Sequence, residues 1–402
     1  MRLIKIGLAN INPTVGAFTA NVDQCIEAAQ ALASEDVTIA LFPEQVVGGY
    51  TPEDLVQWQG FVDGQFVELE RFAAATSDLQ MVSVMGAALA NDGLRYNCAV
   101  VISGGQLLGI VPKQKLPTYN IFYEGRTISR GLPLETGELN GVPFGDLIFR
   151  FDFGTVAVEV CEDLWSPDGP IGRRTYAGAE LVCNISGSPY RVGVQDTRRE
   201  LISTRAADHQ CTIAYVNMVG ANDGLIFDGG SYVNQNGKAY LDGPRFQRGY
   251  TTQVVDLDRT MRLRAENTTW RDDRGQHLDF GDLPERIDIP ETVVATADTR
   301  ARLTYPVPTS GSFFLPAVEP ELADRRSALF EDILDALALG VGDYFEKNRA
   351  FKVIGVSLSG GRDSLLTLLI AHRYATKVRP EDPGALLRAF YQPSRYSSDE
   401  TR

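Results

Sequence analysis

The ten residues VAVEVCEDLW, at positions 156–165, join a short apolar run to a cysteine and an acidic turn. The run predicts a buried strand, and a sharp turn starting at Cys161 would expose the sulfur at the end of that strand. Two other reactive side chains, Glu44 and Lys113, also directly follow apolar runs that predict strands. Because the ends of neighbouring strands converge in α/β folds, we expect these three side chains to lie together.

A cysteine, a carboxylate and an ammonium group suit one kind of chemistry. The thiolate attacks a carbonyl or nitrile carbon, the carboxylate takes the thiol proton, and the ammonium group stabilises the developing oxyanion. The turn after Cys161 would aim the backbone N–H of Glu162 at the same oxyanion. Each residue also has a plainer explanation: Cys161 as a small core residue, Glu44 as a solvated strand end and Lys113 as a loop cap.

The rest of the chain divides into three parts. Residues 1–260 alternate short apolar strands with amphipathic helices and contain several hairpins, which predicts a layered α/β sandwich. Residues 261–318 are rich in charge, Thr and Pro without a sustained period, which indicates a linker or surface excursion. Residues 319–402 start a second unit, with a long helix over 319–348 and a strand over 351–356. That unit is too short for a complete nucleotide-binding domain.

Three motifs resemble the signatures of the nitrilase, or carbon–nitrogen hydrolase, superfamily in their order along the chain: FPE at 42–44, PK at 112–113 and VCEDLW at 160–165. Two longer segments, PKQKLPTYNIFYE at 112–124 and NISGSP at 184–189, resemble the glutaminase domain of glutamine-dependent NAD synthetases. The resemblance covers about residues 1–260. It implies a four-layer αββα sandwich.

The resemblance also implies roles for the reactive residues. Glu44 is the general base, Lys113 stabilises the oxyanion, and Cys161 is the thiol that forms a glutamyl thioester. The backbone N–H of Glu162 contributes to the oxyanion site. Lys115 does not directly follow a proline as the family's lysine does, so Lys113 is the match.

Further residues match substrate contacts of the family. Glu124 matches the second acidic residue, which orients the lysine and binds substrate, and Tyr119 and Ser188 match glutamine contacts. The family often has an arginine shortly after its S-G-S-P motif. Here two residues, Arg191 and Arg198, are candidates for that arginine, so the sequence does not decide which residue binds the substrate amino acid.

A second motif, SGGRDS at 359–364, follows a strand and opens a helix. Two glycines let the backbone approach a phosphate, and a helix N-terminus offers free N–H groups, although an ordinary capped turn has the same form. The motif resembles the PP-loop of ATP pyrophosphatases, which implies part of a Rossmann-like α/β domain of the adenine nucleotide α-hydrolase type. The implied ATP-binding residues are Ser359, Gly360, Gly361, Asp363 and Ser364, with Asp363 as a Mg²⁺ ligand.

Two departures accompany this resemblance. Arg362 stands where the PP-loop usually has a small or apolar residue. Residues 389–398, AFYQPSRYSS, resemble the M-P-S-x-Y-S-S segment of NAD synthetases, with Gln392 in place of the usual Met.

Together the resemblances imply an enzyme that hydrolyses glutamine and uses the ammonia to amidate deamido-NAD to NAD. ATP and Mg²⁺ would activate the carboxylate, with AMP and pyrophosphate released. Ammonia would have to pass between the two sites without escaping to bulk water, which implies tight domain and subunit contacts and a homo-oligomer. No zinc, haem or flavin is expected. Two alternatives are a stand-alone amidase of the nitrilase class with a vestigial C-terminal stub and a non-catalytic partner subunit.

Composition argues against nucleic-acid and membrane partners and favours one cellular compartment. The chain has 38 Lys and Arg against 52 Asp and Glu, a net charge of −14, which argues against nucleic-acid binding by general electrostatics. No apolar run approaches the roughly 18 residues that cross a bilayer, and the start of the chain does not predict a signal peptide. The five cysteines are spread widely without a C-x-x-C motif, which favours a reducing cytoplasm.

Overall fold

The structure is a computed structural model that describes residues 1–307 and 325–391. The described residues form two compact units. The first consists of Met1–Ser188, Gly193–Val219 and the described residues from Gly229 to 307. The second consists of Pro189–Val192, Gly220–Asp228 and the described residues from 325 to 391.

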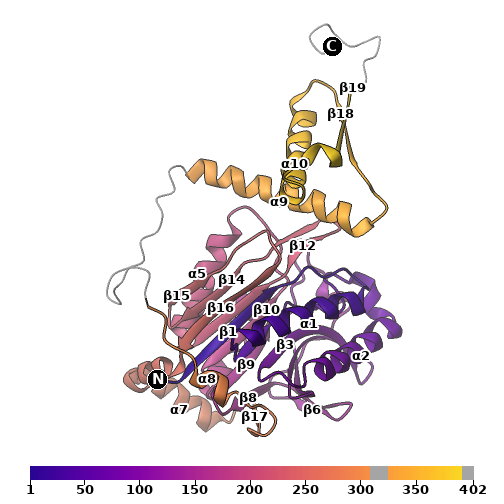
Figure 1. The fold of residues 1–402 in the computed structure, drawn as a ribbon. Helices are drawn as coiled ribbons and strands as arrows, with labels where there is room; N and C mark the ends of the chain where they lie inside the picture. The colour runs from indigo at the N-terminus through magenta and orange to yellow at the C-terminus, as the bar shows by residue number, and fades with distance from the viewer. Residues whose placement is uncertain (308–324, 392–402) are drawn as a thin grey trace. The chain divides into compact units, whose positions relative to one another are not determined.

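Two β-sheets form the centre of the first unit (Figure 1). One has the strand order β16-β1-β2-β3-β4-β5-β7-β6 and the other the order β15-β14-β11-β10-β9-β8-β17. The first sheet comprises β1 (Leu3–Asn10), β2 (Ile39–Leu41), β3 (Val82–Asn91), β4 (Leu94–Ser103), β5 (Gln106–Pro112), β6 (Thr136–Leu139), β7 (Val142–Gly145) and β16 (Gly249–Asp256). The second comprises β8 (Leu147–Phe151), β9 (Gly154–Val160), β10 (Leu181–Ser186), β11 (Thr212–Asn217), β14 (Ser231–Gln235), β15 (Lys238–Asp242) and β17 (Glu285–Asp288).

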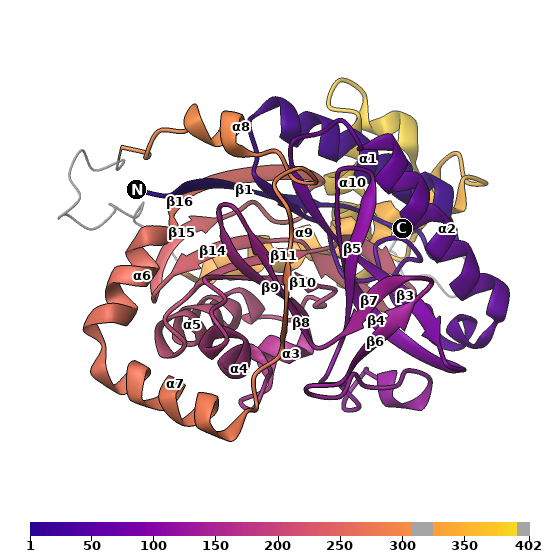
Figure 2. The same cartoon turned by 90° about the horizontal axis from the view of Figure 1, so that it is seen from below.

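An apolar core fills the space between the two sheets, and helices cover their outer faces (Figure 2). On the first sheet lie α1 (Phe18–Ser34) and α2 (Gln59–Ala75), and on the second lie α4 (Ile171–Tyr176) and α5 (Val194–Asp208). The buried residues of α1 recur at helical spacing, which is why this helix presents one apolar face to the sheet. The α/β fold class is confirmed, and its layers are helix, sheet, sheet, helix.

Parallel and antiparallel pairings follow the sequence pattern. Strands separated by a helix pair in parallel, as β9 does with β10 and β10 with β11. The predicted hairpin around Gly104 and Gly105 is the antiparallel pair β4–β5, in which both glycines have positive φ. Lys113 directly follows β5 of the first sheet, and Cys161 directly follows β9 of the second sheet. The two residues therefore lie at strand ends in two facing sheets.

Residues 261–307 contain more regular structure than their sequence predicts. They include most of α6 (Leu257–Glu266) and all of α7 (Thr268–Phe280), β17 and α8 (Ala297–Ala301). Asn267 caps α7 by accepting a hydrogen bond from Trp270 N at 3.0 Å, and the Trp270 ring packs against the Arg264 guanidinium. Because Trp270 is the buried residue of α7, no apolar stripe reveals the helix in the sequence.

The second unit is a small α/β assembly. Strands β18 (Ile354–Leu358) and β19 (Leu387–Tyr391) pair in parallel, with α10 (Arg362–Val378) and the short helix η3 (Pro383–Leu386) between them in the chain. Helix α9 (Arg325–Asn348) packs against α10 through a small apolar cluster that includes Ala338, Tyr374 and Ala375. The predicted start of this helix at 319 and the predicted segment from 392 onward lie outside the described residues.

Two short segments from earlier in the chain belong to this second unit. Tyr190 donates its hydroxyl proton to Asp332 of α9 at 2.9 Å. Ala221 is held at both backbone groups, because its N–H donates to Asp343 at 2.6 Å and its carbonyl accepts from Lys347 at 2.8 Å.

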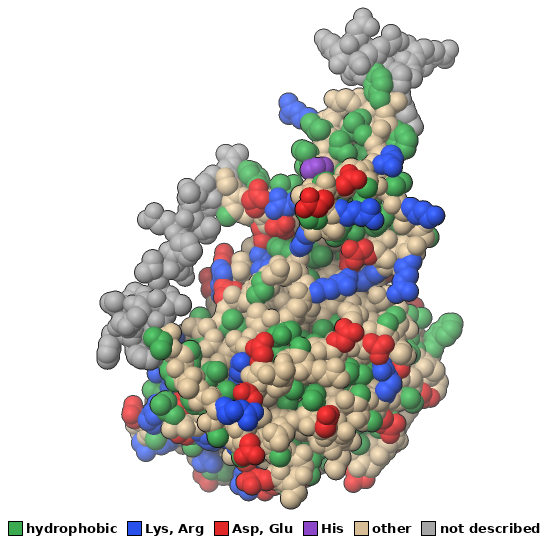
Figure 3. Space-filling view, viewed as in Figure 1, with side chains coloured by type: hydrophobic (Ala, Val, Ile, Leu, Met, Phe, Trp, Pro, Cys, Tyr) green, Lys and Arg blue, Asp and Glu red, His purple; other side chains and the backbone are tan. Residues whose placement is uncertain are grey.

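The surface mixes charges of both signs. Figure 3 shows Lys and Arg side chains interspersed with Asp and Glu over the visible face. None of the helices within the described ranges has the length and apolar character needed to cross a membrane.

Candidate active site

Cys161 occupies a sharp turn between β9 and the short helix α3 (Glu162–Trp165). Its backbone has φ 40° and ψ −94°, a conformation that costs free energy for a residue with a side chain. The Cys161 N–H donates to the Ile185 carbonyl at 2.9 Å, which ties the turn to the end of β10. The acidic residues Glu162 and Asp163 in the first helical turn suit the positive end of the helix dipole.

Asp163 ties the cysteine turn to the lysine segment. One carboxylate oxygen accepts from the backbone N–H groups of Gln114 and Lys115, both at 2.9 Å. The other oxygen accepts from Val160 N at 3.2 Å. Because β5 and β9 belong to different sheets, this buried carboxylate fixes the segment that follows β5 relative to the end of β9.

Lys113 lies between two carboxylates in the interior. Its Nζ donates to Glu44 Oε1 at 2.8 Å and to Glu124 Oε2 at 2.7 Å. The side chains of Lys113 and Glu44 are fully buried, and that of Glu124 nearly so. An ammonium group has three N–H donors. The third has no acceptor assigned within the described part of the chain and is therefore available to a substrate oxygen.

Each oxygen of Glu44 has a different set of donors. Oε1 accepts from both Lys113 and the side-chain amide of Asn97, the latter at 2.7 Å. Oε2 accepts from the backbone N–H of Gly187 at 2.7 Å. A side chain at 187 would place its Cβ 2.7 Å from Tyr50 Cδ1, so only glycine lets this backbone approach Glu44. Oε2, with one donor, is the oxygen that can still receive a proton.

The charges around Lys113 keep it protonated. Burial alone would lower the pKa of Lys113, but the Glu124 and Glu44 carboxylates outweigh burial and hold that pKa well above its usual range. Burial and the neighbouring Glu44 carboxylate raise the pKa of the Cys161 thiol well above its usual value. The nucleophile therefore rests as a thiol at neutral pH and needs a base to remove its proton.

Glu124 differs from an ordinary carboxylate. Burial is the main cause that raises the pKa of Glu124 to about 7, opposed by Lys113 and reinforced by Glu44. Tyr50 donates its hydroxyl proton to Glu124 Oε1 at 3.2 Å. Glu124 therefore changes charge near neutral pH while it stays in contact with the lysine.

The residues predicted to contact glutamine have different surroundings. Tyr119 is half exposed, and its hydroxyl donates to Glu162 Oε2 at 2.9 Å. Ser188 is buried, and its carbonyl accepts from Arg198 at 2.8 Å and from Asn217 at 2.9 Å. Arg198 lies on the buried face of α5, which explains its engagement with Ser188, whereas Arg191 is exposed.

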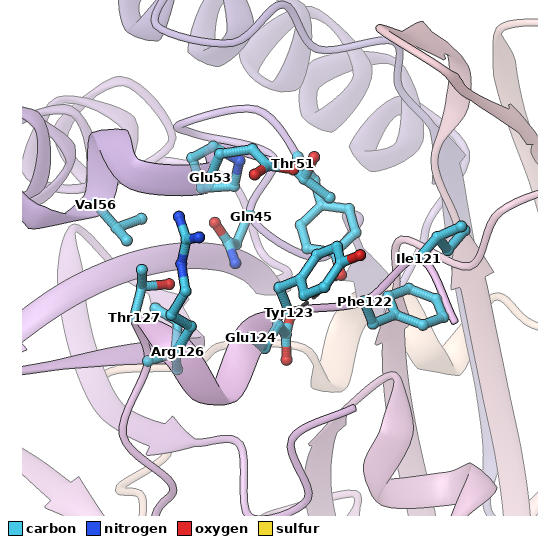
Figure 4. A pocket seen from close by; sticks show the side chains of 13 residues that line it. Gln45, Thr51, Glu53, Val56, Ile121, Phe122, Tyr123, Glu124, Arg126 and Thr127 are labelled. Carbon is cyan, nitrogen blue, oxygen red and sulfur yellow. Dashed lines mark hydrogen bonds between the residues drawn. The ribbon is translucent and has the colours of Figure 1, made fainter. Parts of the chain in front are cut away.

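A small pocket opens beside Glu124 and Tyr50. It is lined by residues 50–53, 56, 121–124 and 126–128 together with Gln45. Figure 4 shows Ile121 and Phe122 at one end of this pocket and Arg126 at the other. Because Glu124 lines the pocket and also contacts Lys113, the pocket reaches the buried cluster from the surface side.

The phosphate-type loop of the second unit is exposed. Gly360 has φ 80°, and α10 starts directly after Gly361. Ser359 and Ser364 contact one another through their hydroxyls at 3.3 Å, and Ser364 also donates to the Gly361 carbonyl at 3.0 Å. The loop therefore presents two hydroxyls and the N-terminus of a 17-residue helix to solvent.

Asp363 lies in the first turn of α10. Among the residues that the structure describes, no group of three or more His, Cys, Asp or Glu side chains could hold a metal ion. A Mg²⁺ ion at Asp363 would thus take most of its oxygen ligands from phosphate and water, as this ion commonly does.

Sequence reasoning missed two side chains that hold the candidate site together by hydrogen bonds. Asp163 stands inside the motif around Cys161, but the turn gave no sign that its carboxylate reaches residues 114 and 115. Asn97 is a polar residue directly before the apolar run 98–102 of β4, which is the one signal that could have singled it out.

Comparison with known proteins identifies the first unit. The family model for carbon–nitrogen hydrolases matches residues 5–265. The chain is 32% identical to the glutamine-dependent NAD(+) synthetase of Thermotoga maritima over 403 aligned positions, covering 100% of this chain and 62% of that protein. It is 29% identical to the enzyme of the same name from Aquifex aeolicus, covering 99% of this chain and 62% of that protein.

A solved structure gives the same result. The glutamine-dependent NAD+ synthetase from Acinetobacter baumannii, in complex with adenosine diphosphate, matches with a TM-score of 0.70 and 27% identity, over 99% of this chain and 61% of that one. The chain thus spans about three fifths of the length of these relatives. Since the family model covers more than half of the chain, the chain belongs to the carbon–nitrogen hydrolase family.

Proposed function

We propose that this chain is the glutamine-hydrolysing part, with the beginning of the ATP-dependent part, of a glutamine-dependent NAD synthetase. Glutamine is hydrolysed at Cys161 to glutamate and ammonia. The ammonia then amidates deamido-NAD to NAD at the expense of ATP, with AMP and pyrophosphate released. The observation that carries the proposal is the buried cluster of Glu44, Lys113 and Glu124, in which the charges of Glu44 and Lys113 act on the Cys161 thiol.

The first half-reaction forms a thioester. Glu44 Oε2 takes the proton from the Cys161 sulfur, and the sulfur attacks the carboxamide carbon of glutamine. When the tetrahedral intermediate collapses, the C–N bond breaks and ammonia leaves with the proton that Glu44 carried. The raised pKa of the thiol makes this base necessary, because little thiolate forms without one.

The second half-reaction releases glutamate. Glu44 takes a proton from a water molecule, whose oxygen attacks the thioester carbon. The C–S bond breaks, glutamate leaves, and the sulfur regains its proton from Glu44. In both halves the third N–H of Lys113 and the backbone N–H of Glu162 stabilise the oxyanion.

Substrate recognition involves three further residues. Glu124 and Tyr119 bind the polar groups of glutamine, since both lie on the segment that lines the pocket mouth or adjoins it. Ser188 contacts the substrate while Arg198 and Asn217 hold its main chain. Arg198 therefore holds the Ser188 main chain in place and does not bind the substrate carboxylate.

The second half of the proposal rests on the loop at 359–364. Ser359, Gly360, Gly361, Asp363 and Ser364 bind the phosphates of ATP, and Mg²⁺ accompanies the nucleotide at Asp363. The helix dipole and N–H groups of α10 favour an anion at this end. The relative from Acinetobacter baumannii was solved with adenosine diphosphate, which supports a nucleotide ligand for this chain.

We also infer a cytoplasmic homo-oligomer. All five cysteines, including the nucleophile, are free thiols buried in the protein, which suits a reducing compartment. Sedimentation of the purified chain tests the assembly.

One assay tests the hydrolytic half. The purified chain is incubated with glutamine and glutamate is measured, with Cys161→Ala as the matched variant. Glutamate released by the parent and not by the variant is the expected result, and no release by either would refute the proposal.

The synthetic half is tested in a longer protein that contains this chain. Cys161→Ala should remove glutamine-dependent NAD formation and leave ammonia-dependent formation. Loss of both activities would contradict the division into two sites.

A further inference from the structure

Asn97 is a buried amide placed among the charged groups of the active site. It lies in β4, opposite Ala88 of β3, and its side chain has no exposed surface. Its backbone carbonyl accepts from the N–H of Lys113 at 2.8 Å. A buried polar side chain costs free energy unless it makes hydrogen bonds, so the partners of the Asn97 amide matter.

The side-chain amide bridges the two carboxylates. Nδ2 donates to Glu44 Oε1 at 2.7 Å and to Glu124 Oε1 at 3.2 Å. Turning the amide by half a rotation would place its oxygen against two carboxylate oxygens, which fixes the donor orientation. Two donor groups, the ammonium of Lys113 and this amide, therefore hold both carboxylates in place.

We propose that Asn97 is a positioning residue for the glutamine hydrolysis proposed above, on which this inference rests. By donating to Glu44 Oε1, Asn97 leaves Oε2 with a single donor, the backbone N–H of Gly187, and so able to accept the thiol proton. By donating to Glu124 as well, it lets a single lysine neutralise two carboxylates and keep one N–H for the oxyanion. Asn97 acts through these groups and does not need to touch the substrate.

This role predicts a specific pH effect. Hydrogen bonds from an amide stabilise the charged form of a carboxylate. Without Asn97, Glu124 takes up its proton at higher pH, and Lys113 loses the charge of one of its two carboxylate partners there. The acidic limb of the pH profile for glutamine hydrolysis should therefore move to higher pH. A residue that only supports the fold would not move this limb.

The test compares three variants of the full chain. Asn97→Leu removes both donors at similar volume, and Asn97→Ser keeps one donor and stays informative if the leucine variant fails to fold. Asn21→Leu is the matched control, because Asn21 is also fully buried but donates only to the main-chain carbonyls of Thr14 and Val47.

For Asn97→Leu we expect kcat to fall about 10- to 100-fold, the size typical of lost hydrogen bonds to charged groups. KM for glutamine should stay within about threefold, and Asn97→Ser should be intermediate. The control should lose thermal stability with its acidic limb unchanged. An unchanged limb in both Asn97 variants, or a raised KM at parental kcat, would overturn the proposal.

A readout without turnover separates this inference from the proposed function. The rate at which iodoacetamide alkylates Cys161 is measured against pH by mass spectrometry of the peptide that contains it. Its acidic midpoint should rise in Asn97→Leu and stay fixed in Asn21→Leu. A parent that releases no glutamate would refute the proposed function, whereas an unchanged alkylation midpoint would refute the role of Asn97.

Discussion

The two candidate sites of this chain are built in opposite ways. In the first unit, Glu44, Lys113 and Cys161 are buried and hydrogen-bonded or packed before any substrate arrives. In the second unit, the loop around Gly360 is exposed, and its serines bond mainly to one another and to the loop backbone. One site is fixed by the core, and the other is formed by a turn and a helix end.

The difference follows from what each site must do. Covalent chemistry needs a base, a nucleophile and an oxyanion donor held within a fraction of an ångström, which buried charge pairs provide at the cost of desolvation. A phosphate brings its own charge, so N–H groups at the surface suffice to bind it. Mutations of the buried charged residues should therefore change both stability and activity in the first unit, whereas mutations of the loop should change mostly ligand binding in the second.

The largest effect is expected for Cys161→Ala. Losing the nucleophile should lower the rate of glutamate release by at least about 10⁴-fold, because the thioester cannot form. The free energy of unfolding should change by only about 1 kcal/mol, since the change is small and the strained backbone stays. Cys183→Ala is the matched control, because Cys183 is buried in the core between the sheets and should retain activity. Glutamate release by Cys161→Ala would contradict the difference drawn between the two sites, because the buried cysteine would not be the nucleophile.

Lys113→Met should affect activity and stability together. The variant leaves two buried carboxylates without their cation, which typically costs about 3–5 kcal/mol, and it removes an oxyanion donor worth about 10²- to 10³-fold in rate. Urea unfolding and glutamate release measure the two effects. Lys115→Met is the control, because Lys115 pairs with an exposed Asp168 at 3.2 Å and should lose less than about 1 kcal/mol. Equal stability losses in the two variants would contradict a buried, preassembled site.

Glu159 tests the effect of burial on pH dependence. Burial is the main cause that raises the pKa of Glu159 to about 8, and neither carboxylate oxygen accepts a hydrogen bond within the described residues. Because the folded pKa lies above the unfolded one, this residue's contribution to stability is complete below about pH 4.5 and is lost as pH rises to about 8. Glu159→Gln should remove the part of the loss of stability with rising pH that comes from this residue.

Thermal unfolding between pH 5 and 9 measures the effect of Glu159→Gln. The exposed Glu138→Gln is the control and should follow the parent curve. A variant that loses more stability than the parent above pH 8 would mean that the Glu159 charge is needed by Arg174, whose guanidinium lies 3.7 Å away.

The smallest effect on glutamine hydrolysis is expected at Gly360. Alanine there must adopt the left-handed φ of 80°, which costs about 1 kcal/mol. Gly361→Ala, at φ −84°, is the matched control. Equilibrium dialysis with ATP and Mg²⁺ should show weaker binding for Gly360→Ala than for Gly361→Ala, with glutamate release unchanged in both. Reduced glutamate release in Gly360→Ala would show that the loop affects the first site.

Sequence reasoning predicted the elements of the first unit because most have strong periodicity. It placed Glu44, Lys113 and Cys161 at strand ends, and the family resemblance added Glu124. Helix α7 was missed because a single buried Trp270 anchors it, which leaves no repeating pattern. Asn97 and Asp163 were missed because their roles depend on contacts between strands far apart in the sequence, which no local pattern records.

The segments Pro189–Val192 and Gly220–Asp228 bear on how this protein can be divided. They lie within the stretch that matches the family model, yet they belong to the second unit, where Asp332 and Asp343 of α9 bind them. A cut after residue 265 would follow the sequence boundary but strip these segments of their partners. Segments of the second unit therefore lie between segments of the first unit along the chain. A soluble fragment of the first unit should need either α9 or polar replacements at Tyr190 and its neighbours.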